Sequence, residues 1–178
     1  RWVEVDLQKI VFNGHYLMYL DTAMADYWRA IALPYQDTMH ALGGDLYVVK
    51  SGLEYKASAE YDDLLHVGLR CARIGTSSIL FEAGIFRGQE LLVKGELVYV
   101  YADSQSKTSM PVPQVLRDTM LGFEQGEPVT QAAQIRYGPT GAGAAQLLQA
   151  TVRGSVIVEI PSRPSAARST LESVDETE

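Results

Sequence analysis

The residues best suited to chemistry stand at the start of the chain, where a lone carboxylate precedes a long apolar segment. Asp6 ends a strand-like run, and seven residues later Asn13 and Gly14 begin the apolar segment. The first N–H groups of a helix lack internal partners and lie at the positive end of the helix dipole, so they can stabilise an oxyanion. The spacing therefore predicts attack on a carbonyl, with Asp6 as general base or nucleophile and the Asn13 backbone N–H as oxyanion donor.

Each of these residues also has a simple structural interpretation. A carboxylate at a strand end is often a solvated turn residue, and Asn is a favoured N-cap. Capping uses the side chain of Asn13 and oxyanion binding uses its main chain, so both roles are compatible, whereas for Asp6 the turn role and the catalytic role stay open. The next residues, His15 and Tyr16, are candidates for support, the first as a polar residue of the first turn and the second by packing or orienting the loop.

One long helix must position these groups. Between His15 and Leu33 apolar residues recur at three- and four-residue steps, and Pro34 closes the segment. The recurring residues are Leu17, Leu20, Met24, Tyr27, Trp28 and Ile31. An apolar stripe this wide, with two aromatic residues, needs a broad surface such as a sheet to cover it.

Four strand-like segments follow a loop that contains Gly43 and Gly44. We predict strands over residues 46–57, 64–74, 77–86 and 90–102, and a short helix over residues 114–123. Because no helix intervenes between the four strands, they form an antiparallel meander. With the opening strand added, the sequence predicts an α+β domain in which a curled antiparallel sheet wraps around one long central helix.

The C-terminal part of the chain has a weaker pattern. Residues 138–145 form a tract of small residues, and residues 155–160 are predicted as one more strand. Residues 161–178 are rich in Ser, Pro, Thr and Glu and are predicted to be disordered or loosely packed. We therefore predict one domain over residues 1–124 and a partly flexible, unassigned extension over residues 125–178.

Composition excludes several classes of function. The net charge of -7, from 22 acidic and 15 basic residues, is against a broad surface for nucleic acid or anionic lipid. No apolar run approaches the roughly 18 to 20 residues of a membrane span. The single cysteine, Cys71, cannot form an internal disulfide, which favours a reducing, cytoplasmic location. The three histidines show no ligand spacing with one another or with Cys71, so neither a metal nor a cofactor is expected.

The opening motif and the order of elements resemble the hotdog-fold acyl-CoA thioesterases, specifically the 4-hydroxybenzoyl-CoA thioesterase-like family. The family motif is approximately E-x-D-x-x-G-x-V-x-N/H/Y-x-x-Y, and its spacing is matched by Glu4, Asp6, Val11, Asn13 and Tyr16. The likeness extends to about Glu124. Where the family has glycine this chain has Lys9, so a turn with positive φ is either absent there or formed by a strained residue.

The resemblance implies the hotdog fold and hydrolysis of acyl-CoA thioesters to free acid and CoA, in a homodimer or homotetramer that completes both sheet and site. It also implies an apolar channel for the acyl group beside the long helix. The phosphates of CoA need local cations in an acidic chain, and residues 73–78 combine a basic side chain with hydroxyl groups and open backbone. The candidates for binding CoA are Arg73, Gly75, Thr76, Ser77 and Lys9. A solvated hairpin turn is the alternative interpretation of this segment.

Three further alternatives are open. An acyl-carrier protein can replace CoA as the carrier of the acyl group. A non-catalytic hotdog protein that binds acyl thioesters, or serves as a scaffold, would keep Asp6 without turnover, and the departure at Lys9 favours it. A hotdog dehydratase would pair a histidine with a carboxylate, and Asn13 at the motif-matched position argues against that reaction.

Overall fold

A computed structural model describes residues 1–127 and 156–160 of the chain. The small-residue tract over residues 138–145 and the predicted tail over residues 161–178 lie outside these ranges. None of the helices formed by the described residues is long and apolar enough to cross a membrane.

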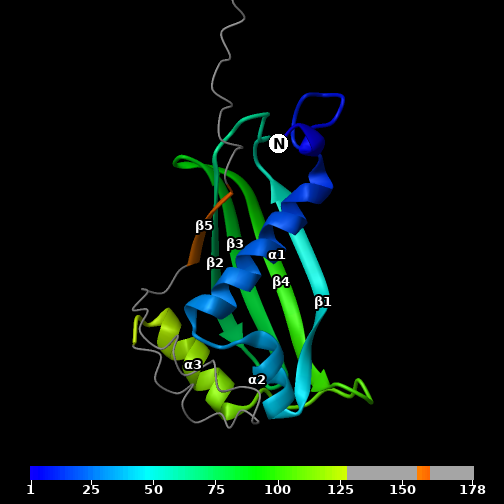
Figure 1. Ribbon diagram of the computed structural model, residues 1–178, viewed down its shortest axis with the longest axis vertical. Coiled ribbons are helices and arrows are strands. Elements are labelled where there is room, and N and C mark those ends of the chain that lie inside the picture. The colour runs from blue at the N-terminus through cyan, green and yellow to red at the C-terminus, as the bar shows by residue number, and fades with distance from the viewer. Residues whose placement is uncertain (128–155, 161–178) are drawn as a thin grey trace, which may run out of the picture.

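The fold consists of one long helix, α1 (Asn13–Ala30), lying across one face of an antiparallel sheet (Figure 1). The strands are β1 (Gly44–Tyr55), β2 (Leu65–Ile74), β3 (Ser78–Arg87), β4 (Glu90–Asp103) and β5 (Val156–Ile160). Their order in the sheet is β1-β4-β3-β2-β5. The predicted α+β fold with a curled sheet around a long helix is confirmed, and the strands of the meander begin and end close to their predicted bounds.

The core between α1 and the sheet is formed by buried residues that recur at two different spacings in the sequence. Buried residues of α1 recur at helical spacing, and those of β3 alternate along the strand, as each element requires to turn one face inward. Tyr27, which is 0% exposed, packs edge-on against Phe81 of β3 and Phe123, with ring centroids 5.3 and 5.5 Å away. Aromatic rings in this geometry bury large areas and fix how the helix lies on the sheet.

The opening residues differ from their predicted strand. Trp2–Glu4 form a short 3-10 helix, η1, in which Glu4 N–H donates to Arg1 O at 3.0 Å. Beyond η1, Val5 makes only an isolated antiparallel bridge with Val11. The fifth strand of the sheet is instead β5, which pairs antiparallel with β2 and confirms the strand predicted near residue 160.

A second helix, α2 (Tyr35–Leu42), occupies a segment that we predicted as loop. Pro34 is its N-cap, and Gly43 ends it with φ of 74°, in the left-handed conformation that glycine adopts without strain. Proline before and glycine after a short segment are ordinary helix boundary signals. The prediction missed them because it treated Pro34 only as the end of the preceding helix.

The third helix, α3 (Gln114–Glu124), was predicted and is confirmed. Its last residue joins three elements, because Glu124 Oε1 accepts hydrogen bonds from Tyr27 Oη at 2.9 Å and from Cys71 N–H at 2.7 Å. Burial raises the pKa of Glu124 above its ordinary value, and these two hydrogen bonds offset part of that rise. The carboxyl group therefore ties α3 to both α1 and β2.

Gly44 provides a test of the packing at the start of β1. A Cβ atom there would lie 2.5 Å from Cζ of Tyr101 and 2.9 Å from Ala102 O, and Tyr101 is 1% exposed with its hydroxyl bound to Leu42 O. We expect Gly44→Ala to lower the free energy of unfolding by about 1–3 kcal/mol, the range for overpacking. Urea denaturation measures this change in the free energy of unfolding. Gly52→Ala, on the same strand with nothing within 4 Å of its Cβ, is the control, and an equal loss in both variants would contradict the steric explanation.

Glu124→Gln tests the buried carboxyl group, since Gln still accepts both hydrogen bonds. The raised pKa of Glu124 means that the folded state holds its proton more tightly than the unfolded state. The resulting stability is complete below the ordinary pKa and is lost as pH rises through the raised one. We expect the melting temperature of the wild type to fall relative to Glu124→Gln as pH rises from about 4 to about 8. Glu127→Gln, at an exposed position, is the control for the loss of one carboxylate, and a difference between wild type and Glu124→Gln that is constant with pH would contradict the expectation.

Candidate active site at the start of α1

Asp6 begins a tight loop that ends at Ile10. Asp6 N–H donates to Ile10 O at 2.9 Å, and Lys9 N–H donates to Asp6 O at 3.0 Å. Lys9 has φ of 64°, so the turn that a glycine would form without strain is present and is formed by a lysine at a conformational cost. Asp6 Oδ1 accepts the N–H of Gln8 at 2.7 Å, an Asx turn. The turn role considered for Asp6 is thus observed, and in the described part of the chain Oδ2 accepts no hydrogen bond.

The start of α1 offers two backbone donors. Phe12 is the N-cap and makes no side-chain capping bond, so Asn13 is the first helical residue and the predicted N-cap role for Asn13 is wrong. His15 N–H donates back to Phe12 O at 3.0 Å. Among the described residues, the N–H groups of Asn13 and Gly14 have no protein acceptor, and the first turn contains no acidic residue to compensate the helix dipole.

A short two-stranded pairing brings the loop and the helix start to the same end of α1. Val5 pairs with Val11, and Phe12 N–H donates to Glu4 O at 2.8 Å. Asp6 directly follows Val5, and Asn13 lies two positions after Val11. The structure therefore holds the two predicted catalytic residues on adjacent segments of chain.

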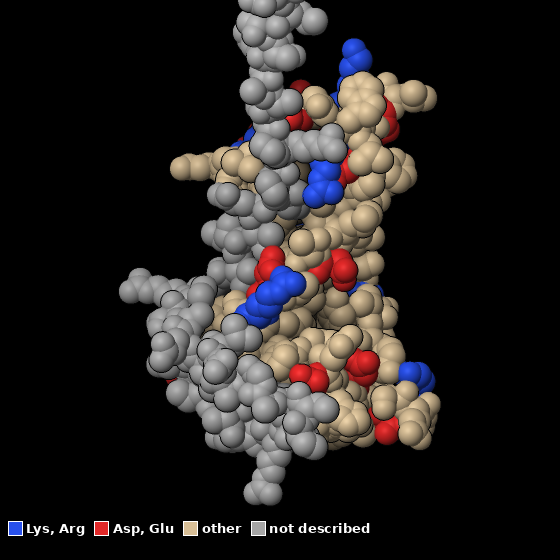
Figure 2. All heavy atoms as spheres, viewed as in Figure 1, with Lys and Arg blue, Asp and Glu red and all other residues tan. Residues whose placement is uncertain are grey.

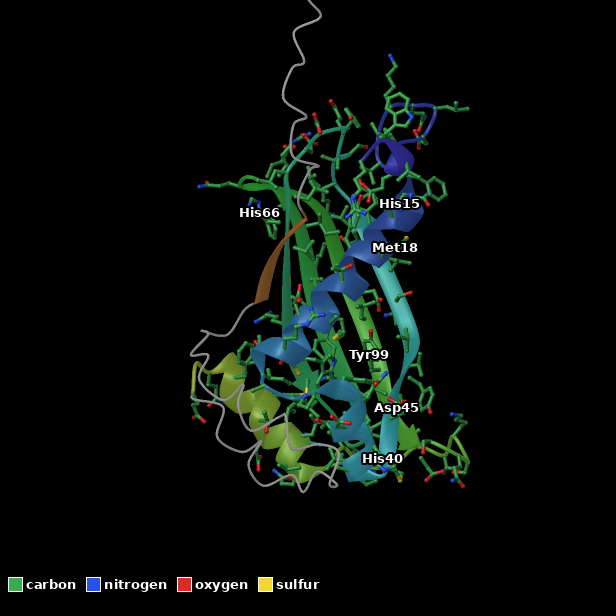
Figure 3. All side chains as sticks on the ribbon, in the orientation of Figure 1. His15, Met18, His40, Asp45, His66 and Tyr99 are labelled. Carbon is green, nitrogen blue, oxygen red and sulfur yellow. The ribbon has the colours of Figure 1, made fainter. Side chains whose placement is uncertain are left out.

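The two predicted supporting residues have different surroundings. Tyr16 is 2% exposed, and its hydroxyl accepts the N–H of Ala59 at 2.9 Å, so it orients a neighbouring loop. Burial raises the pKa of Tyr16, so its hydroxyl stays protonated at neutral pH. His15 is half-buried on the first turn of α1, where its ring lies edge-on to Phe12 with centroids 6.1 Å apart (Figure 3).

Figure 3 shows His40 at the end of the molecule opposite His15, while His66 lies on β2. Within residues 1–127 and 156–160 no group of three or more His, Cys, Asp or Glu side chains is placed to hold a metal ion.

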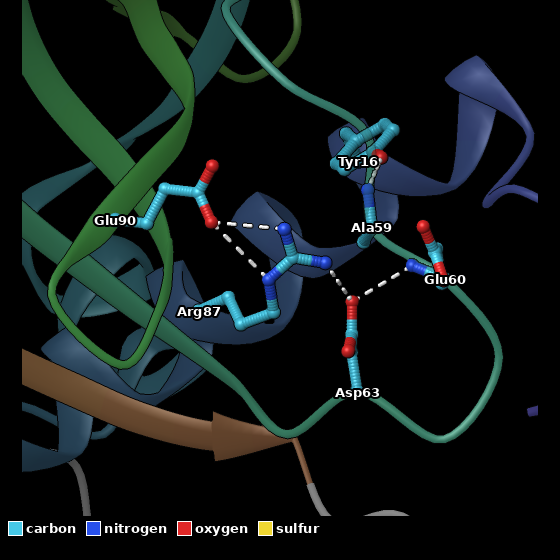
Figure 4. A network of polar contacts seen from close by, with 6 residues as sticks. All are labelled: Tyr16, Ala59, Glu60, Asp63, Arg87 and Glu90. Atoms are coloured by element: carbon cyan, nitrogen blue, oxygen red, sulfur yellow. Dashed lines mark hydrogen bonds and ion pairs between the residues drawn. The ribbon is translucent and has the colours of Figure 1, made fainter.

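Sequence reasoning missed a polar network next to the Ala59 loop (Figure 4). Asp63 Oδ2 accepts hydrogen bonds from Arg87 Nη1 and from the N–H of Glu60, both at 2.8 Å. Arg87 also donates to Glu90 through Nε at 3.3 Å and Nη2 at 2.8 Å. The sequence placed Asp63 and Arg87 in turns beside strands and offered Arg87 as one of several cations for CoA, but it did not pair the two, because they are 24 residues apart and no local spacing connects them.

The predicted CoA-binding hairpin lies far from the helix start within one chain. β2 begins at Leu65, near the loop of Ala59, and ends at Ile74, directly before the hairpin (Figure 1). A strand of this length separates its ends by about 30 Å. Of the CoA-binding candidates only Lys9, in the Asp6 loop, lies at the same end as Asp6.

The backbone of that hairpin is largely occupied by the protein itself. Thr76 O accepts Val112 N–H and Ser77 O accepts Tyr101 N–H, both at 2.8 Å. Arg117 donates to Ile74 O at 2.9 Å and to Gly75 O at 2.7 Å. Arg73 is exposed on the strand end, and no described residue forms an ion pair with it.

A cavity of about 600 Å³ lies beside the second half of α1, where the resemblance to the hotdog thioesterases implies an apolar channel. Its walls are mostly apolar and include four aromatic residues, Trp28, Tyr35, Phe81 and Tyr99, with Asp21 also among the lining residues. Burial raises the pKa of Tyr99, and Asp21 raises it further. At 1.5 Å per residue the cavity begins about 12 Å along α1 from Asn13.

Comparison with known proteins identifies the family. The sequence profile of the thioesterase superfamily matches residues 8–94, which include the start of α1 and begin two positions after Asp6. A putative esterase of Aquifex aeolicus is 25% identical over 120 residues, which cover 66% of this chain and 93% of that protein.

Two solved structures have similar folds. A protein from Pseudomonas aeruginosa is 30% identical, with a TM-score of 0.57, over 68% of this chain and 85% of that one. A 1,4-dihydroxy-2-naphthoyl-CoA thioesterase from Synechocystis has a TM-score of 0.61 over 67% of this chain and 88% of that one, and at 17% identity it shows the hotdog fold alone. Together with the matched motif and the fold, these similarities show that the chain belongs to the thioesterase superfamily.

Proposed function

We propose that this chain hydrolyses acyl-CoA thioesters to free acid and CoA at the start of α1. The observation that carries the proposal is the pair of N–H groups of Asn13 and Gly14, which have no acceptor in the described part of the chain and lie on a segment paired with that of Asp6. These donors suit the negative charge that develops on the thioester oxygen in the transition state. Membership of the thioesterase superfamily supports the same reaction.

Asp6 supplies the other half of the chemistry. Its Oδ1 is bound in the Asx turn, which leaves Oδ2 for reaction. As general base, Asp6 takes a proton from water while the water oxygen attacks the carbonyl carbon and the CoA thiolate leaves. As nucleophile, Asp6 forms a mixed anhydride with loss of the thiolate, and water then hydrolyses the anhydride. Both routes use the same oxyanion donors, and the choice between them stays open.

The assembly that we propose is a homodimer formed along β1, either alone or as half of a tetramer. Among the strands that the structure describes, β1 lies at an edge of the sheet and is hydrogen-bonded only to β4. Apolar side chains are exposed on β1 and on the adjoining turns of α1, with exposed fractions of 60% for Val49 and 61% for Met18. Figure 2 shows this side of the molecule mostly uncharged, with scattered charged side chains. An exposed strand edge beside apolar surface favours pairing with another chain.

Antiparallel pairing of two β1 strands would also complete the site. It would place the helix start of one protomer beside the opposite end of its partner, where the cavity beside α1 and the hairpin of Arg73 lie. We propose that the cavity takes the acyl group and that Arg73, Gly75, Thr76 and Ser77, together with Lys9, contact CoA. The cytoplasmic location stays a prediction from the single cysteine.

Asp6→Asn tests the reaction. Asn can still accept the N–H of Gln8, so we expect the loop to keep its shape while turnover falls at least about a hundredfold, because a principal acid–base group is lost. The measurement is thiol release from short, long and aromatic acyl-CoAs.

The control is Asp103→Asn. Asp103 Oδ1 likewise holds a turn, accepting N–H groups of Gln105 and Ser106, and it lies outside the candidate site. We expect wild-type turnover from it. Equal turnover in Asp6→Asn and wild type would contradict the role of Asp6. Absence of hydrolysis by the wild type on every acyl-CoA would favour a non-catalytic acyl-thioester-binding or scaffold protein.

Val49→Lys tests the assembly. A lysine at this exposed edge position places like charges opposite each other in a paired sheet, so we expect a lower dimer fraction. Light scattering after gel filtration measures the mass at several concentrations. Leu121→Lys, at a 36% exposed position on α3, is the control and is expected to keep the wild-type mass. A monomeric wild type, or an unchanged Val49→Lys, would contradict the interface.

A further inference from the structure

One peptide group links the Asp6 loop and the helix start to the sheet. The carbonyl of Ala59 and the N–H of Glu60 belong to the same planar peptide unit, so the orientation of one sets the orientation of the other. The carbonyl accepts the N–H of Val11 at 2.8 Å, and the N–H donates to Asp63 Oδ2 at 2.8 Å. Val11 lies two positions before Asn13. The carboxylate of Asp63 therefore orients the group that binds the chain leading into α1.

The same segment also contacts both neighbours of that chain. Ala59, which is 0% exposed, donates its N–H to the hydroxyl of Tyr16 in α1 at 2.9 Å. Glu60 forms an antiparallel bridge with Ile10, the residue that closes the Asp6 loop. Residues 59 and 60 thus contact the polypeptide between the two predicted catalytic residues, at Ile10 and Val11, and after the second of them, at Tyr16.

Arg87 fixes Asp63 to the sheet. Arg87 is the last residue of β3 and donates from Nη1 to Asp63 at 2.8 Å, while Nε and Nη2 bind Glu90 at the start of β4 (Figure 4). The guanidinium is thereby held on both sides, with exposed side-chain fractions of 35% for Arg87 and 20% for Asp63. A charge-assisted pair in this geometry holds direction as well as distance.

We propose that Asp63 and Arg87 are positioning residues, which set the placement of the Asp6 carboxylate relative to the Asn13 and Gly14 donors through the Ala59–Glu60 peptide. The proposal rests on the proposed hydrolysis at the start of α1. Neither residue touches the reacting atoms, so both act through the backbone.

A positioning role and a general contribution to stability predict different losses of turnover relative to the loss of stability. A misplacement of about 1 Å in a catalytic group can reduce turnover about a hundredfold. An ion pair that is partly exposed to solvent contributes little to stability. Loss of the pair is therefore expected to lower kcat strongly and the melting temperature only slightly.

The experiment compares Asp63→Ala and Arg87→Met with their conservative counterparts. Asp63→Asn keeps an oxygen that accepts the Glu60 N–H, and Arg87→Lys keeps a positive charge. We expect kcat to fall about tenfold or more in Asp63→Ala and Arg87→Met, with KM within about threefold of wild type. We expect Asp63→Asn and Arg87→Lys to recover most of the lost kcat.

Glu82→Ala is the matched control. It breaks the Arg70–Glu82 pair, which also joins an arginine to a carboxylate on the strands β2 and β3, at 2.6 Å, but contacts neither residue 59 nor residue 60. We expect its kcat to equal that of the wild type. A loss in Glu82→Ala as large as in Asp63→Ala, or no recovery in the conservative variants, would overturn the proposal.

Amide hydrogen exchange gives a readout that does not depend on turnover. We expect the N–H groups of Glu60 and Val11 to exchange faster in Asp63→Ala than in wild type, and unchanged exchange in Glu82→Ala. Unchanged exchange of these two amides in Asp63→Ala overturns the positioning role, as does faster exchange with wild-type kcat. Full turnover in Asp6→Asn would instead refute the proposed reaction, while the exchange result still decides whether Asp63 controls the peptide.

Discussion

The burial of one face of α1 against the sheet is the constraint on which the rest of the structure depends. Tyr27, near the C-terminal end of α1, contacts Phe81 on β3 and Phe123 on α3, so one residue joins α1 to the sheet and to a second helix. Removing such side chains from water stabilises the fold and simultaneously fixes where the helix begins and ends. The first turn of α1 is consequently held at one end of the sheet, and its backbone donors have a fixed direction.

The proposed oxyanion site follows from the backbone N–H groups that the start of a helix leaves without acceptors inside the helix. Asn13 and Gly14 have N–H groups without acceptors in the described residues, and no side chain caps them. A protein usually fills such a site with a capping oxygen, and Phe12 at the N-cap provides none. Nothing among the described residues fills this helix start, which is where the proposed reaction places the thioester oxygen. Lys9, held with positive φ, indicates that the adjoining loop keeps a strained shape, as sites with a function often do.

The meander has a different consequence for the binding of CoA. Because consecutive strands run in opposite directions, the turn after β2 lies at the end of the sheet away from Asn13, and the cavity beside Trp28 lies toward that same far end. One chain therefore separates the groups that the proposed reaction needs together. Antiparallel pairing along an edge strand reverses one protomer relative to the other and removes that separation, which gives assembly a direct role in the proposed function.

The sequence by itself determined the parts that rest on local chemistry. Helical and alternating spacing of apolar residues specified α1 and the four meander strands, and the motif around Asp6 and Asn13 indicated the family, because these signals lie within short stretches of chain. Only the tertiary structure decided that Asn13 is not the N-cap, that residues 2–4 form η1 and that β5 completes the sheet. It also brought Arg87 to Asp63, since contacts between residues far apart in sequence depend on how the strands pack and leave no pattern in their own neighbourhoods.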